Sequence, residues 1–269
     1  MKKILVTGAG SYIGTAFESY MNRFPDLYRV DTVDMIDGTW REKSFAGYDA
    51  VFHVAGIAHR KETKDNAPLY YKVNRDLAIE TAQKAKADGV KQFVFLSSMS
   101  VYGRETGVIT PETLPAPKSH YGKSKLQAEE GIREMEDDAF RVCVLRPPMV
   151  YGEGRKGNYQ TIVKIVQKSP IFPRVNNRRS LIHIDNLIRF VKLCVDRELA
   201  GLYFPQNREY MNTRLMAKEI AREKGKRLYF SYAAGGAVVV FRPLLSILKK
   251  AFGNLIYKDT EVFDFEYCE

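Results

Sequence analysis

Cysteine and long apolar segments are scarce in this sequence, and each scarcity excludes a class of protein. The three cysteines, Cys143, Cys194 and Cys268, stand apart and form no Cys-x-x-Cys pair. An odd number of isolated cysteines argues against a disulfide framework and favours a reducing cytoplasm. No stretch reaches the roughly 18 apolar residues that a membrane span requires. The apolar run after Met1 is too short for a secretory signal peptide, so the sequence predicts a cytoplasmic protein.

Metal-binding patterns and concentrated positive charge are also missing. The 4 histidines are scattered without metal-ligand spacing, so no metal site is predicted. The formal net charge is +10 and the pI is about 9.3, but no long basic run or zinc-finger spacing accompanies them. Because the charge is spread along the chain, we expect a small phosphate-bearing substrate and no nucleic acid.

The composition is otherwise that of an ordinary globular protein. The chain has 269 residues, of which 45% are hydrophobic and 28% are charged. This length suits one large domain or a domain with a small lobe, and it allows a full hydrophobic core.

Strand and helix patterns alternate in the first half of the chain. Short runs of strand-forming residues occur at 4–6, 28–33, 50–54, 92–96 and 141–145. Helical spacing of apolar residues occurs between them, at 13–23, 70–87 and 119–136. This alternation predicts an α/β fold in which βαβ units form a parallel sheet.

After Gly152 the rhythm changes. We expect helices at 158–168, 186–196 and 212–224, with a short strand at 180–184. The predicted division is a nucleotide-binding domain over 1–152, with sheet and helix contributions from 180–200, and a substrate-binding cap over 153–269.

Residues 228–241 contain no charged side chain and include Gly235-Gly236, and an amphipathic helix is expected at 244–252. Two interpretations stay open for this C-terminal lobe. The segment can form the core of the cap, or it can make a weak contact with a membrane surface.

A glycine-rich segment, Thr7-Gly8-Ala9-Gly10-Ser11-Tyr12-Ile13-Gly14, follows the first strand and opens the first helix. Glycines allow a tight turn and a close approach of pyrophosphate, which the helix N-terminus then attracts. Asp34 ends the second strand, where it can accept hydrogen bonds from adenosine ribose hydroxyls. No Arg or Lys occurs at 35–40, so the pattern favours NAD over NADP.

Tyr121 and Lys125 lie four residues apart on a predicted helix, so they share a face. A neighbouring lysine cation lowers the pKa of a phenol toward the working pH, which makes the pair a proton-transfer unit. Ser98 follows another predicted strand and can hold the same substrate oxygen. Together the three residues predict oxidation–reduction chemistry.

These features resemble the extended short-chain dehydrogenase/reductase family, in particular its sugar-nucleotide epimerases and reductases. The resemblance runs from Lys3 to about Ala217 and includes His53-Val54-Ala55-Gly56, Ser-Ser-x-x-Val-Tyr-Gly and Leu145-Arg146-Pro147. It implies a Rossmann-type doubly wound parallel sheet with a small C-terminal substrate-binding cap. It also implies a catalytic Ser98, Tyr121 and Lys125.

The resemblance assigns further residues to ligands. The implied cofactor-binding set is Gly8, Gly10, Ser11, Tyr12, Ile13, Gly14, Asp34, Asp37, Gly38, Val54, Ala55, Gly56, Asn74, Tyr121, Lys125 and Pro147. The implied substrate-binding set for a UDP-sugar is Ser98, Met99, Tyr121, Asn158, Phe172 and Arg179, with Arg179 at the phosphates and Phe172 near the uracil. A homodimer formed through the helices at 69–86 and 119–136 is also implied.

Three departures from the family pattern stand out. Ser11 replaces the middle glycine of the phosphate loop, Met149 replaces an Asn, and the second phosphate-binding Arg has no clear counterpart. More narrowly, segments such as Asn176-Asn177-Arg178-Arg179-Ser180 resemble bacterial capsule and O-antigen enzymes, which implies a role in cell-surface polysaccharide biosynthesis.

Two functions follow from the resemblance. The first is an NAD-dependent UDP-sugar 4-epimerase, and the alternative is an NAD(P)H-dependent 4-keto reductase that makes a 6-deoxy UDP-N-acetylhexosamine. A 4,6-dehydratase is disfavoured because Met99 and Ser100 stand where that branch has acids. A non-catalytic nucleotide-binding protein conflicts with the intact Ser98, Tyr121 and Lys125.

Overall fold

A six-stranded parallel sheet forms the centre of the larger part of the molecule. The structure, a computed structural model, describes residues 1–58, 62–152, 158–241, 244 and 246–260. The sheet order is β10-β6-β4-β3-β1-β2. Its strands are β1 (Lys2–Thr7), β2 (Tyr28–Val33), β3 (Ala50–His53), β4 (Gln92–Leu96), β6 (Arg141–Leu145) and β10 (Gly201–Tyr203). This sheet confirms the predicted α/β fold class.

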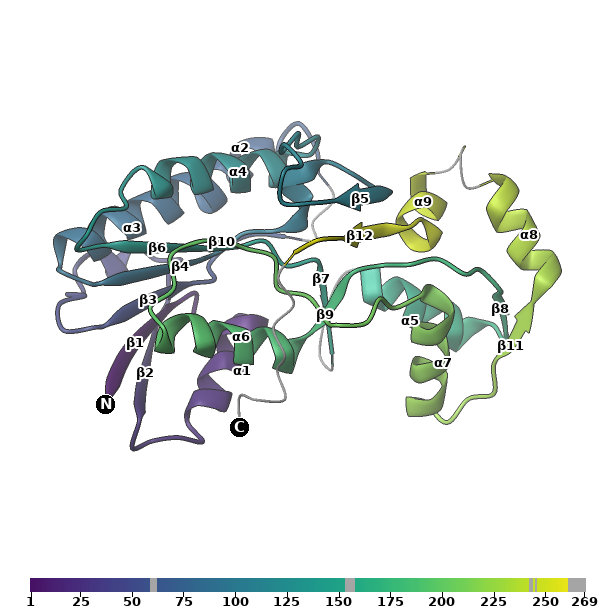
Figure 1. Cartoon of the computed structure of the whole chain (residues 1–269), viewed down its shortest axis with the longest axis horizontal. Coiled ribbons are helices and arrows are strands. Elements are labelled where there is room, and N and C mark those ends of the chain that lie inside the picture. The colour runs from purple at the N-terminus through teal and green to yellow at the C-terminus, as the bar shows by residue number, and fades with distance from the viewer. Residues whose placement is uncertain (59–61, 153–157, 242–243, 245, 261–269) are drawn as a thin grey trace.

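Helices cover both faces of the sheet (Figure 1). One face packs against α1 (Tyr12–Met21) and α6 (Ile184–Asp196), and the other against α3 (Leu77–Ala87) and α4 (His120–Arg133). The inner strands β1, β3, β4 and β6 are largely buried on both sides, which explains their apolar sequences.

The predicted helix at 70–87 is interrupted in the structure. A short helix α2 (Ala67–Tyr70) leads into a π-helical segment over Tyr71–Asp76, and α3 begins only at Leu77. Asn74 lies in the π-helical segment and is fully buried. Such wide turns are often found at functional sites, and this one directs Asn74 toward the loop that follows β3.

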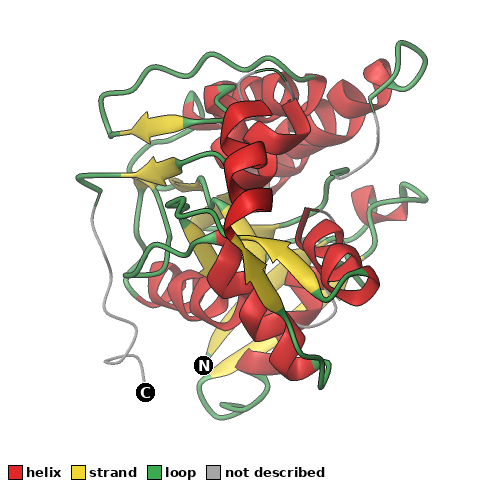
Figure 2. Cartoon of the chain, turned by 90° about the vertical axis from the view of Figure 1, so that its right-hand side faces the viewer, coloured by secondary structure: helices red, strands yellow, loops and turns green. Residues whose placement is uncertain are grey.

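The C-terminal part of the chain builds a smaller lobe at one end of the sheet (Figure 1). Its helices are α5 (Asn158–Lys168), α7 (Thr213–Glu223), α8 (Tyr232–Phe241) and α9 (Ser246–Phe252), and its strands β8 (Ile171–Pro173) and β11 (Tyr229–Ser231) pair in parallel. A separate apolar cluster fills this cap, with Val166, Phe172, Met216 and Ile220 among its buried members. Turned by 90°, the cap lies in front of the sheet (Figure 2).

Two short ladders join the cap to the sheet domain. Strand β7 (Met149–Tyr151) pairs with β9 (Leu181–His183), and β5 (Gly107–Ile109) pairs with β12 (Leu255–Tyr257). The second ladder returns the C-terminal strand from the cap to the turn after β4. Among the described residues, none of the helices has the length and apolarity needed to cross a membrane.

Candidate active site

The glycine-rich loop holds the start of α1 at the carboxyl end of β1. Gly8 has a φ of +93°, and a Cβ there would lie 2.9 Å from the Cα of Ala55. Any side chain at this position would therefore separate the loops that follow β1 and β3. Gly10 also has a left-handed φ, of +72°.

Ser11 begins α1 as its N-cap. The Ser11 Oγ accepts a hydrogen bond from the Gly14 backbone N–H at 3.2 Å. A Cβ at Gly14 would lie only 2.7 Å from this oxygen. The departure from the family's glycine thus supplies a capping side chain, which stabilises the helix terminus that attracts phosphate.

The residues predicted to hold the adenosine lie in the loop after β2. Asp34 is exposed, and its Oδ1 accepts the Ile36 backbone N–H at 2.9 Å. Asp37 accepts hydrogen bonds from the hydroxyl and backbone N–H of Thr39, which lower the pKa of Asp37. Gly38 has a φ of +86°, which a glycine adopts without strain.

Arg41 was not considered in the sequence analysis, although it follows this loop. Its guanidinium donates two hydrogen bonds to the Glu80 carboxylate and lies 4.6 Å from the centroid of the Trp40 ring. The Arg41 cation is therefore paired with Glu80 in this structure.

His53 ends β3 beneath the glycine-rich loop. The ring is fully buried between Phe93 and Phe95, and its Nδ1 lies 2.8 Å from the Thr7 Oγ1. Burial, with a smaller contribution from the Lys125 charge, lowers the pKa of His53 to about 3. The ring is neutral at physiological pH and links β1 to β3.

The predicted triad converges on one cavity. Ser98 follows β4, and its Oγ accepts the Ser100 backbone N–H at 3.1 Å. Tyr121 and Lys125 lie on the first turns of α4, which begins after the capping residue Ser119. All three residues line a cavity of about 450 Å³ at the carboxyl ends of the central strands. Ligands of open α/β sheets bind at this edge.

Lys125 lies one turn after Tyr121 on α4 and is buried. It is only 4% exposed, and its Nζ donates to the Leu96 carbonyl at 2.8 Å. Burial lowers the pKa of Lys125 to about 8. At neutral pH the group carries a positive charge in a place with little solvent, so it favours the ionised form of a neighbouring phenol.

The cavity also includes some of the other predicted residues. From the implied cofactor set it includes Ile13, Val54, Gly56 and Pro147. From the implied substrate set it includes Met99 and Arg179. The remaining glycine-loop and adenosine residues lie along the same edge of the sheet, after β1 and β2.

Asn74 positions the loop that carries Gly56. Its Oδ1 accepts the Ile57 backbone N–H at 2.8 Å, and its Nδ2 donates to the Ile57 carbonyl and the Ser124 hydroxyl. A Cβ at Gly56 would lie 2.9 Å from this Oδ1. Asn74 therefore ties the loop after β3 to α4.

The loops that follow β1, β2 and β3 have features that suit a dinucleotide. Backbone at Gly8 and Gly56 approaches its neighbours so closely that no side chain fits. A capped helix N-terminus and an exposed terminal acid lie at the same sheet edge. These are the parts that a pyrophosphate and a ribose require, so the chain fits NAD.

Glu62 is a cavity residue that the sequence analysis missed. Its two carboxylate oxygens accept the backbone N–H groups of His120 and Tyr121, at 2.9 and 3.0 Å. It thereby caps the helix on which Tyr121 lies and also lines the cavity. No sequence pattern marks this loop residue, since the contact spans 58 positions.

Two cations on the cap side of the cavity were also missed. Arg104 donates to the Val108 carbonyl at 2.7 Å, and Lys250 from α9 lies 3.5 Å from Glu105. Arg179, which donates to the Gly253 carbonyl at 2.9 Å, is a third cation of the cavity, and Glu62 and Glu105 line the same cavity. Lys250 is thus a candidate for the second phosphate-binding cation that the sequence pattern lacked.

A buried ion pair lies beside the site and joins the elements that carry its residues. Arg146 donates to the Glu129 carboxylate and, at 2.8 Å, to the Tyr102 hydroxyl. Ser97 donates to the same carboxylate. The network fixes α4 against β6 and against the turn that follows Ser98.

Among the described residues, one predicted substrate residue does not line the cavity. Phe172 has no exposed surface and packs against Phe230 and Phe252 in the cap cluster. The prediction that it flanks a base is therefore wrong for this structure, because a fully buried ring cannot stack on a ligand. The side chain of Asn158 lies outside the described residues.

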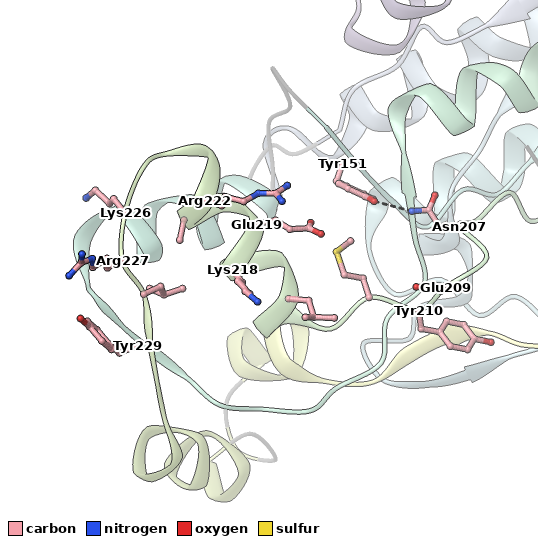
Figure 3. A pocket seen from close by; sticks show the side chains of 14 residues that line it. Tyr151, Asn207, Glu209, Tyr210, Lys218, Glu219, Arg222, Lys226, Arg227 and Tyr229 are labelled. Carbon is pink, nitrogen blue, oxygen red and sulfur yellow. Dashed lines mark hydrogen bonds between the residues drawn. The ribbon is translucent and has the colours of Figure 1, made fainter. Parts of the chain in front are cut away.

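A larger cavity of about 840 Å³ opens in the cap (Figure 3). It lies against α7 and the segment before β11, and Tyr151 accepts a hydrogen bond from Asn207 at its edge. Its charged lining residues are Glu209, Lys218, Glu219, Arg222, Lys226 and Arg227. None of the triad lines it, so the smaller cavity is the candidate active site.

A family model and known proteins are similar to this chain over most of its length. A family model described as the NAD dependent epimerase/dehydratase family matches residues 4–202. A UDP-glucose 4-epimerase of Vibrio cholerae is 30% identical over 246 residues, which cover 82% of this chain and 75% of that protein. An N-acetyl-alpha-D-glucosaminyl-diphospho-ditrans,octacis-undecaprenol 4-epimerase of Escherichia coli O157:H7 is 25% identical, over 84% of this chain and 73% of the relative.

Solved structures share the fold at lower identity. A UDP-glucuronic acid 4-epimerase from Bacillus cereus in complex with NAD has a TM-score of 0.70 at 19% identity, over 99% of this chain and 96% of that one. A dTDP-4-dehydrorhamnose reductase from Clostridium acetobutylicum has a TM-score of 0.70 at 21% identity, over 86% and 83%. These two similarities show the fold alone.

Proposed function

Because the chain belongs to the NAD-dependent epimerase/dehydratase family, we propose that it is a 4-epimerase acting on C4 of a UDP-sugar. The observation that carries the proposal is the convergence of Ser98, Tyr121 and Lys125 on one cavity. That cavity has cofactor-loop residues at one end and Arg179 and Lys250 at the other.

Some residues of the chain would hold the cofactor, and others would bind and deprotonate the substrate hydroxyl. Gly8, Ser11 and Asp34 would hold NAD, which when bound supplies an acceptor and donor for hydride. Tyr121, as the phenolate, takes the proton of the C4 hydroxyl while C4 loses its hydride. Ser98 hydrogen-bonds the same oxygen, and the Lys125 cation favours the phenolate.

Epimerisation then requires the oxidised sugar to rotate within the cavity, so that its opposite face meets the cofactor. The 4-keto sugar regains hydride at its opposite face, and Tyr121 returns the proton to the C4 oxygen. The sugar is first oxidised and then reduced, so no net reductant is consumed. Arg179 and Lys250 would hold the diphosphate through this rotation, because both are cations at the cap end of the cavity.

The carrier of the sugar has two candidate forms. Relatives are named for UDP-glucose and for a sugar diphosphate linked to undecaprenol. Both carriers present a diphosphate to the cationic end of the cavity. We propose the UDP-sugar as the substrate and a role in supplying sugars for cell-surface polysaccharides, and assays should offer both carriers.

A second candidate function is a 4-keto reductase. The fold similarity to a dTDP-4-dehydrorhamnose reductase favours it, since the same triad protonates the C4 oxygen in a one-way reduction. A reductase would release its oxidised cofactor after each turnover, whereas an epimerase returns the hydride to the same sugar.

The state of the purified protein distinguishes these functions. The protein is denatured, and any released nucleotide is identified by chromatography and mass. The epimerase predicts that NAD is retained, and that turnover occurs without added cofactor. Release of no nucleotide, together with stoichiometric loss of absorbance at 340 nm when NADH or NADPH is mixed with a 4-keto UDP-sugar, would instead establish the reductase.

A further inference from the structure

Helix α8 exposes apolar side chains of a kind that surface helices normally lack. Its sequence, Tyr-Ala-Ala-Gly-Gly-Ala-Val-Val-Val-Phe, contains no charged residue. A helix that is apolar all round is ordinarily buried, yet only Gly235 and Val238 are buried here. Val239, Val240 and Phe241 are 50%, 67% and 51% exposed. The expectation that this segment forms cap core therefore holds only for its inner face.

Two neighbouring glycines identify the inner and outer faces of α8. A Cβ at Gly235 would lie 2.3 Å from the carbonyl oxygen of Arg174, so this face lies directly against the chain after β8. A Cβ at Gly236 would meet nothing within 4 Å. Val239 and Val240 follow Gly236 by one turn and share its outward face. The helix stands at the end of the cap farthest from the sheet (Figures 1 and 2).

The sequence around this outer face is rich in positive charge. Residues 224–258 contain no Asp or Glu, and their cations are Lys224, Lys226, Arg227, Arg242, Lys249, Lys250 and Lys258. Of these, Lys250 and Lys258 pair with Glu105 and Asp259, and Lys250 belongs to the active-site cavity. Arg174 adds a further cation, with its guanidinium 4.3 Å from the centroid of the Tyr232 ring. Tyr229 and Tyr232 are 62% and 70% exposed.

We propose that the outer face of α8 docks the protein on an anionic lipid surface. Val239, Val240 and Phe241 would enter the interface, while Arg174, Arg227 and the exposed tyrosines meet the headgroups. A membrane surface has anionic headgroups over an apolar interior. Apolar side chains flanked by cations and tyrosines match both parts of it. The contact is peripheral, and it goes beyond the proposed function because it involves no residue of the active site.

The same features disfavour two other occupants. A nucleic acid would use the cations but would leave the valines and Phe241 exposed to water. A second copy docked through α8 would bring two acid-free, positively charged segments together. A lipid surface uses both the apolar face and the charge.

The test is sedimentation of the purified full chain with vesicles. Vesicles of phosphatidylcholine alone are compared with vesicles that also contain phosphatidylglycerol. We expect the chain to sediment with the anionic vesicles, and added salt to weaken the binding because it screens the headgroups. The Val240→Asp variant should lower the partition coefficient about tenfold, the effect of withdrawing one aliphatic side chain and opposing the anionic surface.

Leu27→Asp is the matched control, since Leu27 is 57% exposed between α1 and β2, on the sheet domain. It makes the same change of charge and should bind as wild type does. Val239→Asp repeats the test if Val240→Asp lowers the unfolding temperature. Equal binding by wild type and Val240→Asp would overturn the proposal, as would a dimer that Val240→Asp dissociates or duplex DNA binding that Val240→Asp abolishes.

Discussion

Lys125 is an ionisable group that is buried, so the free energy of unfolding depends on pH. Its pKa falls to about 8 from an ordinary 10.5 because burial disfavours the charged form. Between these pH values the unfolded chain binds more protons than the folded chain does. Rising pH therefore stabilises the fold across this window.

The Lys125→Met variant isolates this contribution. The free energy of unfolding of wild type, relative to the variant, should rise by about 1.4 kcal/mol per pH unit through the window and by about 3 kcal/mol in total. Denaturant titrations at a series of pH values measure it. A difference that stays constant with pH would show that Lys125 is not desolvated as described.

Glu62 offers a second prediction at the scale of one side chain. Glu62→Gln keeps an acceptor but removes the negative charge from the N-terminus of α4. We expect a loss of about 1 kcal/mol in stability and a lower rate of turnover, because the Tyr121 backbone N–H loses a charged partner. Thermal unfolding and kinetics measure both.

Glu105→Gln is the comparison for Glu62→Gln, since Glu105 lines the same cavity and lies 3.5 Å from Lys250 of α9. Its unfolding temperature should stay near that of wild type, as partly exposed ion pairs contribute little. Equal destabilisation by the two variants would contradict the capping role of Glu62.

Individual site residues were predictable to different degrees. The spacing of Tyr121 and Lys125 predicted a shared face because one helix fixes both positions. Glu62 and Lys250 reach the cavity through contacts between distant segments, which no local pattern encodes. Phe172 was misassigned because the local sequence, an apolar residue before a proline, is the same for a residue that faces a ligand and for one that faces a core.

At the scale of elements, α4 is packed so closely that one of its glycines is required. A Cβ at Gly122 would lie 2.5 Å from the Ser100 carbonyl oxygen, within the turn that carries Ser98. A Cβ at Gly131, on the same helix, would meet only the end of the Ile79 side chain, at 2.8 Å. The two positions therefore predict opposite outcomes for one substitution.

Gly122→Ala should separate α4 from the turn and lower turnover at least tenfold, since misplacement of about 1 Å has effects of this size or larger. Gly131→Ala should retain activity and gain up to about 1 kcal/mol of stability from the better helix former. Kinetics and denaturant unfolding compare them. Similar losses of turnover in both variants would contradict the close packing of α4 against Ser98.

Long elements were predictable, whereas most short ones were not; the three-residue strand β9, within the predicted 180–184, is an exception. The buried strands and the helices of the sheet domain have enough residues to show their period. Strands β5, β7, β8, β11 and β12 contain 3 residues each, too few to establish alternation. The π-helical segment was also missed; its Asn74 bonds to Ile57, a tertiary contact that no local pattern encodes.

At the scale of the whole molecule, Tyr257 joins the returning C-terminal strand to the sheet domain. The residue is fully buried, and its hydroxyl donates to the Arg146 carbonyl at 2.8 Å. Tyr257→Phe should lower the free energy of unfolding by about 1 kcal/mol, because it leaves a buried carbonyl without this donor. Denaturant unfolding measures the change.

Tyr203→Phe is the control for Tyr257→Phe. Its hydroxyl donates to the Ala200 carbonyl at 3.0 Å in a solvent-exposed turn, so water can replace it. A larger loss in Tyr203→Phe than in Tyr257→Phe would contradict the role of β12 in joining cap and sheet domain.

In the proposed reaction, Tyr121 moves the C4 proton of a UDP-sugar whose hydride is returned to the same sugar. The most direct measurement follows UDP-hexoses and UDP-N-acetylhexosamines deuterated at C4 by NMR, with wild type and Tyr121→Phe and without added cofactor. Wild type should interconvert the C4 epimers of one substrate with deuterium retained, and Tyr121→Phe should be at least about a hundredfold slower while still binding NAD. Equal rates for the two proteins, loss of deuterium, or no interconversion of any substrate by wild type would contradict the claim.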